Sequence, residues 1–151
     1  MSQAKLLSKE ESASMPVEAS RVPVSRLYEE AWGRGKPRPV DEMVAPGFFD
    51  HHHRQGGPEN LKRIIWSVRT TFLDMKFVLE EQVAEGNRVV SRWALHGIDK
   101  DGLLGLPPTG GRATFEGISA DCVVGDQIVE HRGQSDMLGL LRQLGLMPAL
   151  D

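Results

Sequence analysis

The chain has 151 residues, of which 18 are basic and 21 acidic, so its formal net charge is −3. A weakly acidic chain offers no basic surface for a phosphate backbone, and we therefore expect no nucleic-acid partner. No run of residues approaches the roughly 20 apolar side chains needed to span a bilayer, so we expect no membrane partner either. The single cysteine, Cys122, excludes an intrachain disulfide and cysteine-rich zinc sites. These features predict a cytoplasmic protein.

One domain is expected, because domains most often contain roughly 100–150 residues. Residues 1–18 are rich in Ser, Lys and Glu and lack a regular apolar pattern, which predicts a flexible N-terminal tail. The start of this segment also lacks the apolar run of a secretory signal. The folded domain is therefore expected over residues 19–151.

Two segments in the first half of the chain have the apolar spacing of an amphipathic helix. The first places five side chains on one helical face: Val24, Leu27, Tyr28, Ala31 and Trp32. Gly33 and Gly35 predict the end of this helix. The second helix begins at Pro58, a residue suited to a first helical turn, and its apolar side chains are Leu61, Ile64, Ile65, Val68 and Phe72. Each helix has a broad apolar face that needs a sheet to cover.

The segment between these two helices is less regular. A short helix is expected over residues 40–44, and Pro46-Gly47 is expected to break it. An extended segment over residues 48–53 then leads into a loop before the second amphipathic helix.

The second half of the chain reads as strands joined by turns. The loop over residues 105–111 contains two prolines and three glycines, which cannot pair in a ladder. A last helix is predicted around three leucines and ends at Gly145: Leu138, Leu141 and Leu144. Helices followed by an antiparallel meander predict an α+β fold with helices on one face of a curved sheet. The predicted strands cover residues 75–84, 88–98, 113–124 and 127–137.

Seven short segments, in this order, cover residues 27–32, 50–51, 83–90, 92–93, 105–110, 128–131 and 136–141. Together they resemble the SnoaL-like polyketide cyclases of the nuclear-transport-factor-2-like superfamily, over about residues 22–146. The resemblance implies a conical fold, with N-terminal helices packed on a strongly curved antiparallel sheet around an internal apolar pocket. It also implies a homodimer that closes a ring in a polyketide-like substrate by intramolecular aldol condensation, with no cofactor and no metal.

The resemblance further implies that an aspartate at the end of the last long strand is the general acid/base, and Asp136 matches that position. An apolar pocket would raise the pKa of such a carboxyl group toward the working pH. Asp136 also directly precedes a helical run, where aspartate is a favoured N-cap, so the residues leave both roles open. The chain departs from the family at Arg132, where tryptophan is frequent, and at Gln134-Ser135, where a bulky apolar residue is frequent.

His131 is the first candidate partner for this aspartate, because histidine titrates near neutral pH. Residues 131 and 136 have opposite parity, so a regular strand would point them to opposite faces. A bulge at Gly133 would restore a common face. Without that bulge, His131 would have a structural role.

A second polar cluster is Asp50-His51-His52-His53. His51 and His53 face the same way in an extended segment, but the sequence offers no third ligand nearby, so no metal site is predicted. The resemblance implies instead that His51 lines the pocket and hydrogen-bonds a substrate oxygen.

Seven further side chains are expected to contact the substrate: Tyr28, Trp32, Phe49, His53, Trp93, Phe115 and Gln134. Tyr28 and Trp32 lie on the apolar face of the first helix and could instead be core residues without a substrate contact. His53 could equally lie in an exposed loop. Two alternatives to the cyclase stay open. One is an epoxide-opening or other ring-forming or isomerising enzyme, which would use Arg132 and Gln134 beside Asp136. The other is a protein that binds an apolar small molecule without chemistry.

Overall fold

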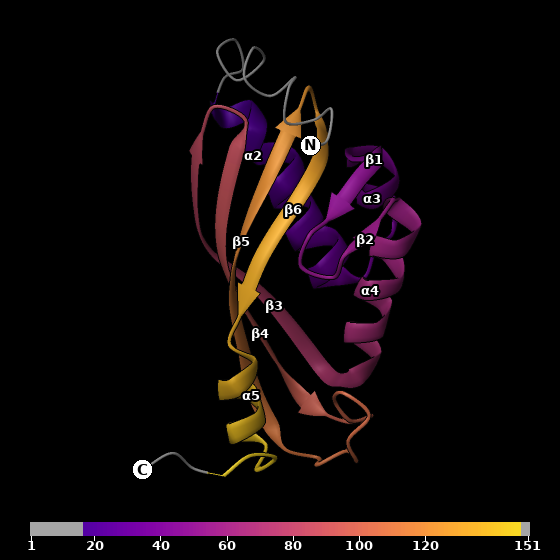
Figure 1. The fold of residues 1–151 in the computed structure, drawn as a ribbon, viewed down its shortest axis with the longest axis vertical. Coiled ribbons are helices and arrows are strands. Elements are labelled where there is room, and N and C mark those ends of the chain that lie inside the picture. Colours follow the sequence, from indigo (N-terminus) through magenta and orange to yellow (C-terminus); the bar gives the residue numbers. More distant parts are fainter. Residues whose placement is uncertain (1–16, 149–151) are drawn as a thin grey trace.

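In the computed structural model, which describes residues 17–148, helices cover one face of a curved six-stranded sheet (Figure 1). This arrangement confirms the predicted α+β fold. Residues 1–16, which make up most of the predicted tail, lie outside the described residues, whereas residues 17 and 18 belong to the first helix. No helix within the described range is long and apolar enough to cross a membrane.

The N-terminal helix changes from α to π geometry along its length. Helix α2 (Val17–Arg26) continues directly into the π-helix η1 (Leu27–Trp32). At most 3% of the surface is exposed in four predicted core residues: Val24, Leu27, Tyr28 and Ala31. The chain leaves the helix at Gly35, whose φ of 71° is the left-handed conformation expected of a C-terminal glycine. Single π turns often occur at functional sites, and this one carries three residues of the pocket described below.

The predicted short helix is present as α3 (Arg38–Met43) and ends before Pro46-Gly47, but strand β1 (Val44–Asp50) follows it without a loop, so the prediction that the extended segment begins at residue 48 is wrong. Proline has no N–H for a ladder and occurs in sheets at edges or irregularities. Here the pairing of β1 with β6 (Gln127–Ser135) shifts in register within the stretch that contains both residues. This irregularity lets β1 pass through the proline and lie beside β6.

The strand order of the sheet is β2-β1-β6-β5-β4-β3. Neighbouring strands pair antiparallel except β1 and β6, which are parallel. The predicted meander is therefore confirmed for β3 to β6, and residues 105–111 form a loop as expected. The remaining elements are β2 (Gln55–Gly56), α4 (Pro58–Thr71), β3 (Phe72–Glu85), β4 (Arg88–Asp99), β5 (Arg112–Val124) and α5 (Met137–Gln143).

Both later helices bury fewer of the predicted residues than their patterns suggested. Helix α4 starts at Pro58 as expected and buries Leu61 and Ile65, but Phe72 is already the first residue of β3. In α5 Leu140 is buried at 1% exposure, and the predicted Leu144 is buried at the end of the helix, whereas Leu138 is 42% exposed. Because α5 packs across the end of the sheet, a different side of the helix faces the core.

The core consists of two apolar clusters. One joins α2, η1 and α4 to the inner face of the sheet, and the other lies between the ends of β4 and β5 and helix α5. Phe77 packs against both clusters. The pocket lies beside this ring, where the two clusters meet.

Candidate active site

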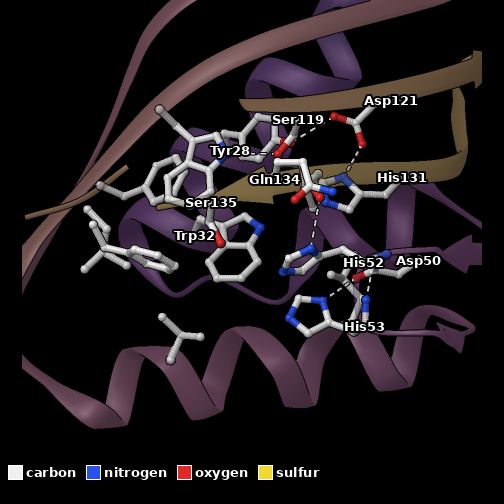
Figure 2. Close-up of a pocket in the computed structure, with 18 of the residues that line it drawn as sticks. Tyr28, Trp32, Asp50, His52, His53, Ser119, Asp121, His131, Gln134 and Ser135 are labelled. Atoms are coloured by element: carbon white, nitrogen blue, oxygen red, sulfur yellow. Dashed lines mark hydrogen bonds and ion pairs between the residues drawn. The ribbon is translucent and has the colours of Figure 1, made fainter. Parts of the chain in front are cut away.

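A pocket with about 90 Å³ of free space lies between the helices and the inner face of the sheet. One part of its wall is aromatic and contains Tyr28, Trp32, Phe48, Phe77, Trp93 and Phe115. Polar side chains from β1, β5, β6 and the turn after β1 gather at its other end (Figure 2): Asp50, His52, His53, Ser119, Asp121, His131 and Gln134. The pocket thus places proton donors and acceptors next to a flat apolar surface.

Stacked rings make the apolar wall rigid. The ring of Phe77 lies 5.7 Å from that of Tyr28 at an interplanar angle of 4°, and it also stacks on Trp32 at 6.0 Å and Trp93 at 5.5 Å. The indole N–H of Trp93 donates to Ser119 Oγ at 2.9 Å. Aromatic pairs of this kind contribute about 0.5–1.5 kcal/mol beyond their buried area. The resulting surface fits a flat, conjugated ligand.

Asp121 is the buried carboxylate of the polar end, and sequence analysis did not identify it. It lies on β5 directly opposite His131 on β6, and its side chain has no exposed surface. His131 Nδ1 lies 2.7 Å from Asp121 Oδ1, and the Tyr28 hydroxyl donates to Asp121 Oδ2 at 2.8 Å. Both oxygens of this carboxylate therefore have donors, and Asp121 reaches a ligand only through these two side chains.

The electrostatics of this group favour an imidazolium. Burial lowers the pKa of His131, but the charge and hydrogen bond of Asp121, together with the charge of Asp50, outweigh it and raise the pKa above its ordinary value. Burial, and then the charge of Asp121, raise the pKa of Tyr28 well above its ordinary value, so the phenol stays neutral. His131 is thus a proton donor whose charge is held by a buried anion.

A second Asp–His pair lies on the neighbouring strand. Asp50 ends β1, pairs in register with His131, and is only 2% exposed. Its Oδ1 accepts the backbone N–H groups of His52 at 2.8 Å and His53 at 3.1 Å, while His53 Nδ1 lies 2.7 Å from Oδ2. Burial raises the pKa of Asp50, but the two hydrogen bonds from His53 and the charges of His131 and His53 outweigh burial, so the pKa is lowered from its ordinary value. Asp50 is therefore a buried anion.

Asp136 does not lie in the pocket, so the prediction that it is the buried acid/base is wrong. Strand β6 ends at Ser135, and Asp136 is the N-cap of α5, where its Oδ1 accepts the N–H of Gly139 at 2.8 Å. Its side chain is exposed and borders a groove on the outer face of the sheet, near Arg92 and Glu116. The helix-cap role that the sequence also allowed is the one observed.

His51 and Phe49 also point away from the pocket, which contradicts their predicted roles. Side chains alternate along β1, so Phe48 and Asp50 face inward while Phe49 faces outward and is 38% exposed. The His51 ring packs edge-on against Phe49 at 4.9 Å, and His51 Nε2 lies 3.6 Å from a carboxylate oxygen of Glu130. The turn over residues 51–54 instead brings the next two histidines to the pocket.

His131 faces the pocket, although the bulge at Gly133 that would have put it on the same face as Asp136 is not present. The pairing of β5 with β6 is regular around Gly133, and its only register shift lies further along, between Cys122 and Val123. His131 and Asp136 therefore lie on opposite faces, and the partner of His131 is Asp121. A signal for Asp121 was present in the sequence, because it is the one charged residue in the apolar stretch that ends β5.

The other predicted contact residues line the pocket: Tyr28, Trp32, His53, Trp93, Phe115 and Gln134. Their contact with a substrate remains a prediction. Within residues 17–148, no three His, Cys, Asp or Glu side chains are grouped in a way that could hold a metal ion. Arg92 forms ion pairs with Glu80 and Glu81 on exposed strand positions outside the pocket.

Comparison with known proteins agrees with this geometry. The sequence model of the SnoaL-like polyketide cyclases matches residues 23–144. The aklanonic acid methyl ester cyclase DnrD of Streptomyces peucetius is 30% identical over 133 residues, which cover 84% of this chain and 92% of the relative. The nogalonic acid methyl ester cyclase of Streptomyces nogalater is 31% identical over 120 residues, which cover 76% of this chain and 90% of the relative.

A solved structure shows the same fold. TsrD from Streptomyces laurentii superposes with a TM-score of 0.80 at 25% identity, over 88% of this chain and 99% of the other. The fold, the matched family and the curated relatives lead to one conclusion: the chain belongs to the SnoaL-like polyketide cyclases of the nuclear-transport-factor-2-like fold and is a polyketide cyclase.

Proposed function

We propose that this cyclase closes a ring in a methyl-ester-bearing polyketide by intramolecular aldol addition, with His131 as the group that polarises and then protonates the accepting carbonyl. The substrate class is supported by the relatives, which are named as cyclases of aklanonic acid and nogalonic acid methyl esters. The observation that carries the mechanism is the buried carboxylate of Asp121, bonded to both His131 and Tyr28 inside an aromatic pocket.

The chemistry needs one proton donor at the site of bond formation. A carbanion next to a carbonyl attacks a second carbonyl carbon, the new C–C bond forms, and the π electrons of that C=O move onto oxygen. His131 Nε2 then gives its proton to this alkoxide, while Asp121 holds Nδ1 and the positive charge of the resting ring. A positioned acid contributes about 10²–10⁴-fold, and the folding of the substrate on the aromatic wall contributes several kcal/mol more.

The size of the pocket limits what it encloses. Its 90 Å³ are less than the roughly 150 Å³ of a protein cavity that takes up one benzene ring. We infer that only the reacting end of a polycyclic substrate enters this space. The remainder would lie in the adjoining open groove between the turn after β1 and helix α4, which shares His53 and Val68 with the pocket.

A pair of variants tests the proposal with aklanonic acid methyl ester and nogalonic acid methyl ester as substrates. His131→Gln removes the proton donor and should reduce turnover about 10²–10⁴-fold. Asp136→Asn alters an exposed carboxylate that caps α5, and should keep both turnover and stability, because asparagine is an equally good N-cap. Loss of activity in Asp136→Asn with retention in His131→Gln would refute the assignment. Absence of any ring closure by the unmodified protein would refute the substrate class.

We also propose that the protein is a homodimer through the outer face of its sheet. Val83 and Val90 face each other across β3 and β4 and are 61% and 41% exposed, and Ile118 on β5 is 52% exposed. Light scattering should give twice the chain mass, and Ile118→Glu should give the monomer. A monomeric unmodified protein would refute this. The cytoplasmic location stays a prediction.

A further inference from the structure

We propose that Asp50 and His53 form a second proton-transfer pair, in which His53 Nε2 is the base that takes the proton from the nucleophilic carbon. This inference depends on the proposed aldol function, because it supplies the step that precedes the action of His131. It concerns a catalytic residue, His53, and a positioning residue, Asp50.

The first support is geometric. His53 Nδ1 lies 2.7 Å from Asp50 Oδ2, the same distance that separates His131 from Asp121. The Asp50 side chain is 3% exposed, and its other oxygen accepts two backbone N–H groups. These bonds fix the carboxylate, and an anion so placed requires a donor at Nδ1. Nε2 is therefore the ring atom with the lone pair in neutral His53.

The second support is the distribution of roles among the other pocket groups. Asp121 has donors at both oxygens and no exposed side-chain surface, so it cannot reach a carbon atom of a ligand. His131 favours the imidazolium form, in which both ring nitrogens are donors. Tyr28 is a neutral phenol that donates to Asp121. A proton acceptor must come from another residue.

His53 also has the right position for this role. It lines both the pocket and the adjoining groove, and its side chain is 38% exposed. His52 lies beside it, but its Nδ1 is 3.0 Å from the backbone carbonyl oxygen of Gly133, which is a neutral acceptor. Of these two histidines, His53 is the one bonded to a buried carboxylate, which would stabilise the cation formed when Nε2 accepts a proton.

The two pairs then complete one balanced reaction. The C–H bond between two substrate carbonyls breaks, its proton moves to His53 Nε2, and the electron pair remains on the substrate as the enolate. The carbanion attacks the second carbonyl, and His131 Nε2 protonates the new alkoxide. His53 returns its proton to water, His131 takes one up, and no oxidant or reductant is involved. The product is an isomer of the substrate.

The test separates proton removal from ring closure, with both methyl esters as probes in deuterated buffer. His53→Gln should abolish protein-dependent deuterium exchange at the acidic carbon and lower kcat about 10²–10⁴-fold, with a smaller change in KM. His131→Gln should lose ring closure but retain exchange above the rate without protein. The matched control is His51→Gln, which makes the same substitution two residues away in the turn after β1, where the ring packs on Phe49 outside the pocket, and it should retain both activities.

Asp50→Asn tests the positioning role. The amide oxygen can still accept the two backbone N–H groups, while the amide NH₂ meets Nδ1 and forces the proton onto Nε2. Exchange should be lost in a folded protein, with kcat reduced more than KM is raised. Exchange that survives in His53→Gln, or is lost only in His52→Gln, would overturn the inference and leave the aldol function standing. An unmodified protein that neither exchanges nor cyclises either ester would overturn both.

Discussion

The buried pair of Asp121 and His131 makes a prediction about stability that does not require a substrate. Asp121→Asn keeps the size of the side chain and removes its charge. The asparagine oxygen can accept from only one of the two donors that meet Asp121, either His131 Nδ1 or the Tyr28 hydroxyl. The other group must then accept from the amide NH₂, the hydroxyl by rotating or His131 by carrying its proton on Nε2. Two hydrogen bonds to a charged carboxylate are thereby replaced by weaker neutral ones, which costs about 1–3 kcal/mol. This loss applies at every pH at which the protein is folded.

The loss of charge adds a contribution that depends on pH. The pKa of His131 is raised in the folded protein, where burial lowers it but Asp121 and Asp50 outweigh burial. A raised folded pKa contributes stability that is complete below the unfolded value of about 6.5 and is lost as the pH rises through the folded pKa. Without the Asp121 charge, burial acts against the imidazolium, so the variant should instead become less stable as the pH falls.

The destabilisation by Asp121→Asn should therefore be larger at pH 5.5 than at pH 8.5. We expect the free energy of unfolding to fall by about 3–5 kcal/mol at the lower pH, as when one partner of a buried ion pair is removed. At the higher pH we expect it to fall by about 1–3 kcal/mol. Urea unfolding at both values measures the free energies, with the exposed cap variant Asp136→Asn as the control. Equal destabilisation at the two pH values, or a larger one at pH 8.5, would refute the view that Asp121 holds a charged imidazole.

Three further substitutions test the packing of the pocket. Tyr28→Phe keeps the stacked ring but removes a hydrogen bond to the buried carboxylate, and should lower the free energy of unfolding by about 1.5–3 kcal/mol in urea titrations; an unchanged midpoint would contradict that bond. Gly117→Ala would place a methyl group 2.3 Å from the Trp93 indole, so we expect about 1–3 kcal/mol of destabilisation and a lower Tm. Gly133→Ala would place a methyl group 3.3 Å from His131 Nε2; turnover should fall while the urea midpoint stays nearly constant, and full turnover would show that Nε2 is approached from another side.

Local signals in the sequence were sufficient for most of the framework. The apolar period of 24–32 predicted which face of the first helix is buried, and Pro58 marked the start of α4. Turns rich in glycine and polar residues separated the strands of the meander. These features depend on residues a few positions apart, so they can be recognised from one segment at a time.

The candidate site depended on relationships that no single segment contains. The hairpin that joins β5 to β6 turns at residues 125–126, and regular pairing from that turn would place residue 130 opposite Asp121. The register shift between Cys122 and Val123 moves the pairing by one residue and brings His131 there instead. A shift of one residue turns every later side chain to the other face. Assigning strand faces from odd and even residue numbers alone therefore could not identify the pair of Asp121 and His131.

The same reason explains the other differences. An aspartate at position 136 is compatible with either a buried acid or a helix cap. The end of β6 at Ser135 shows that Asp136 caps α5. The inward position of His53 depends on the turn after β1 and on a buried Asp50 that organises it. The sequence by itself determined the helices and the meander, because apolar periodicity and turn residues act locally, and its short segments resembling the SnoaL-like cyclases indicated the family. Tertiary structure alone decided which carboxylate meets which imidazole, because strand register and chain reversal are set by pairing between distant segments.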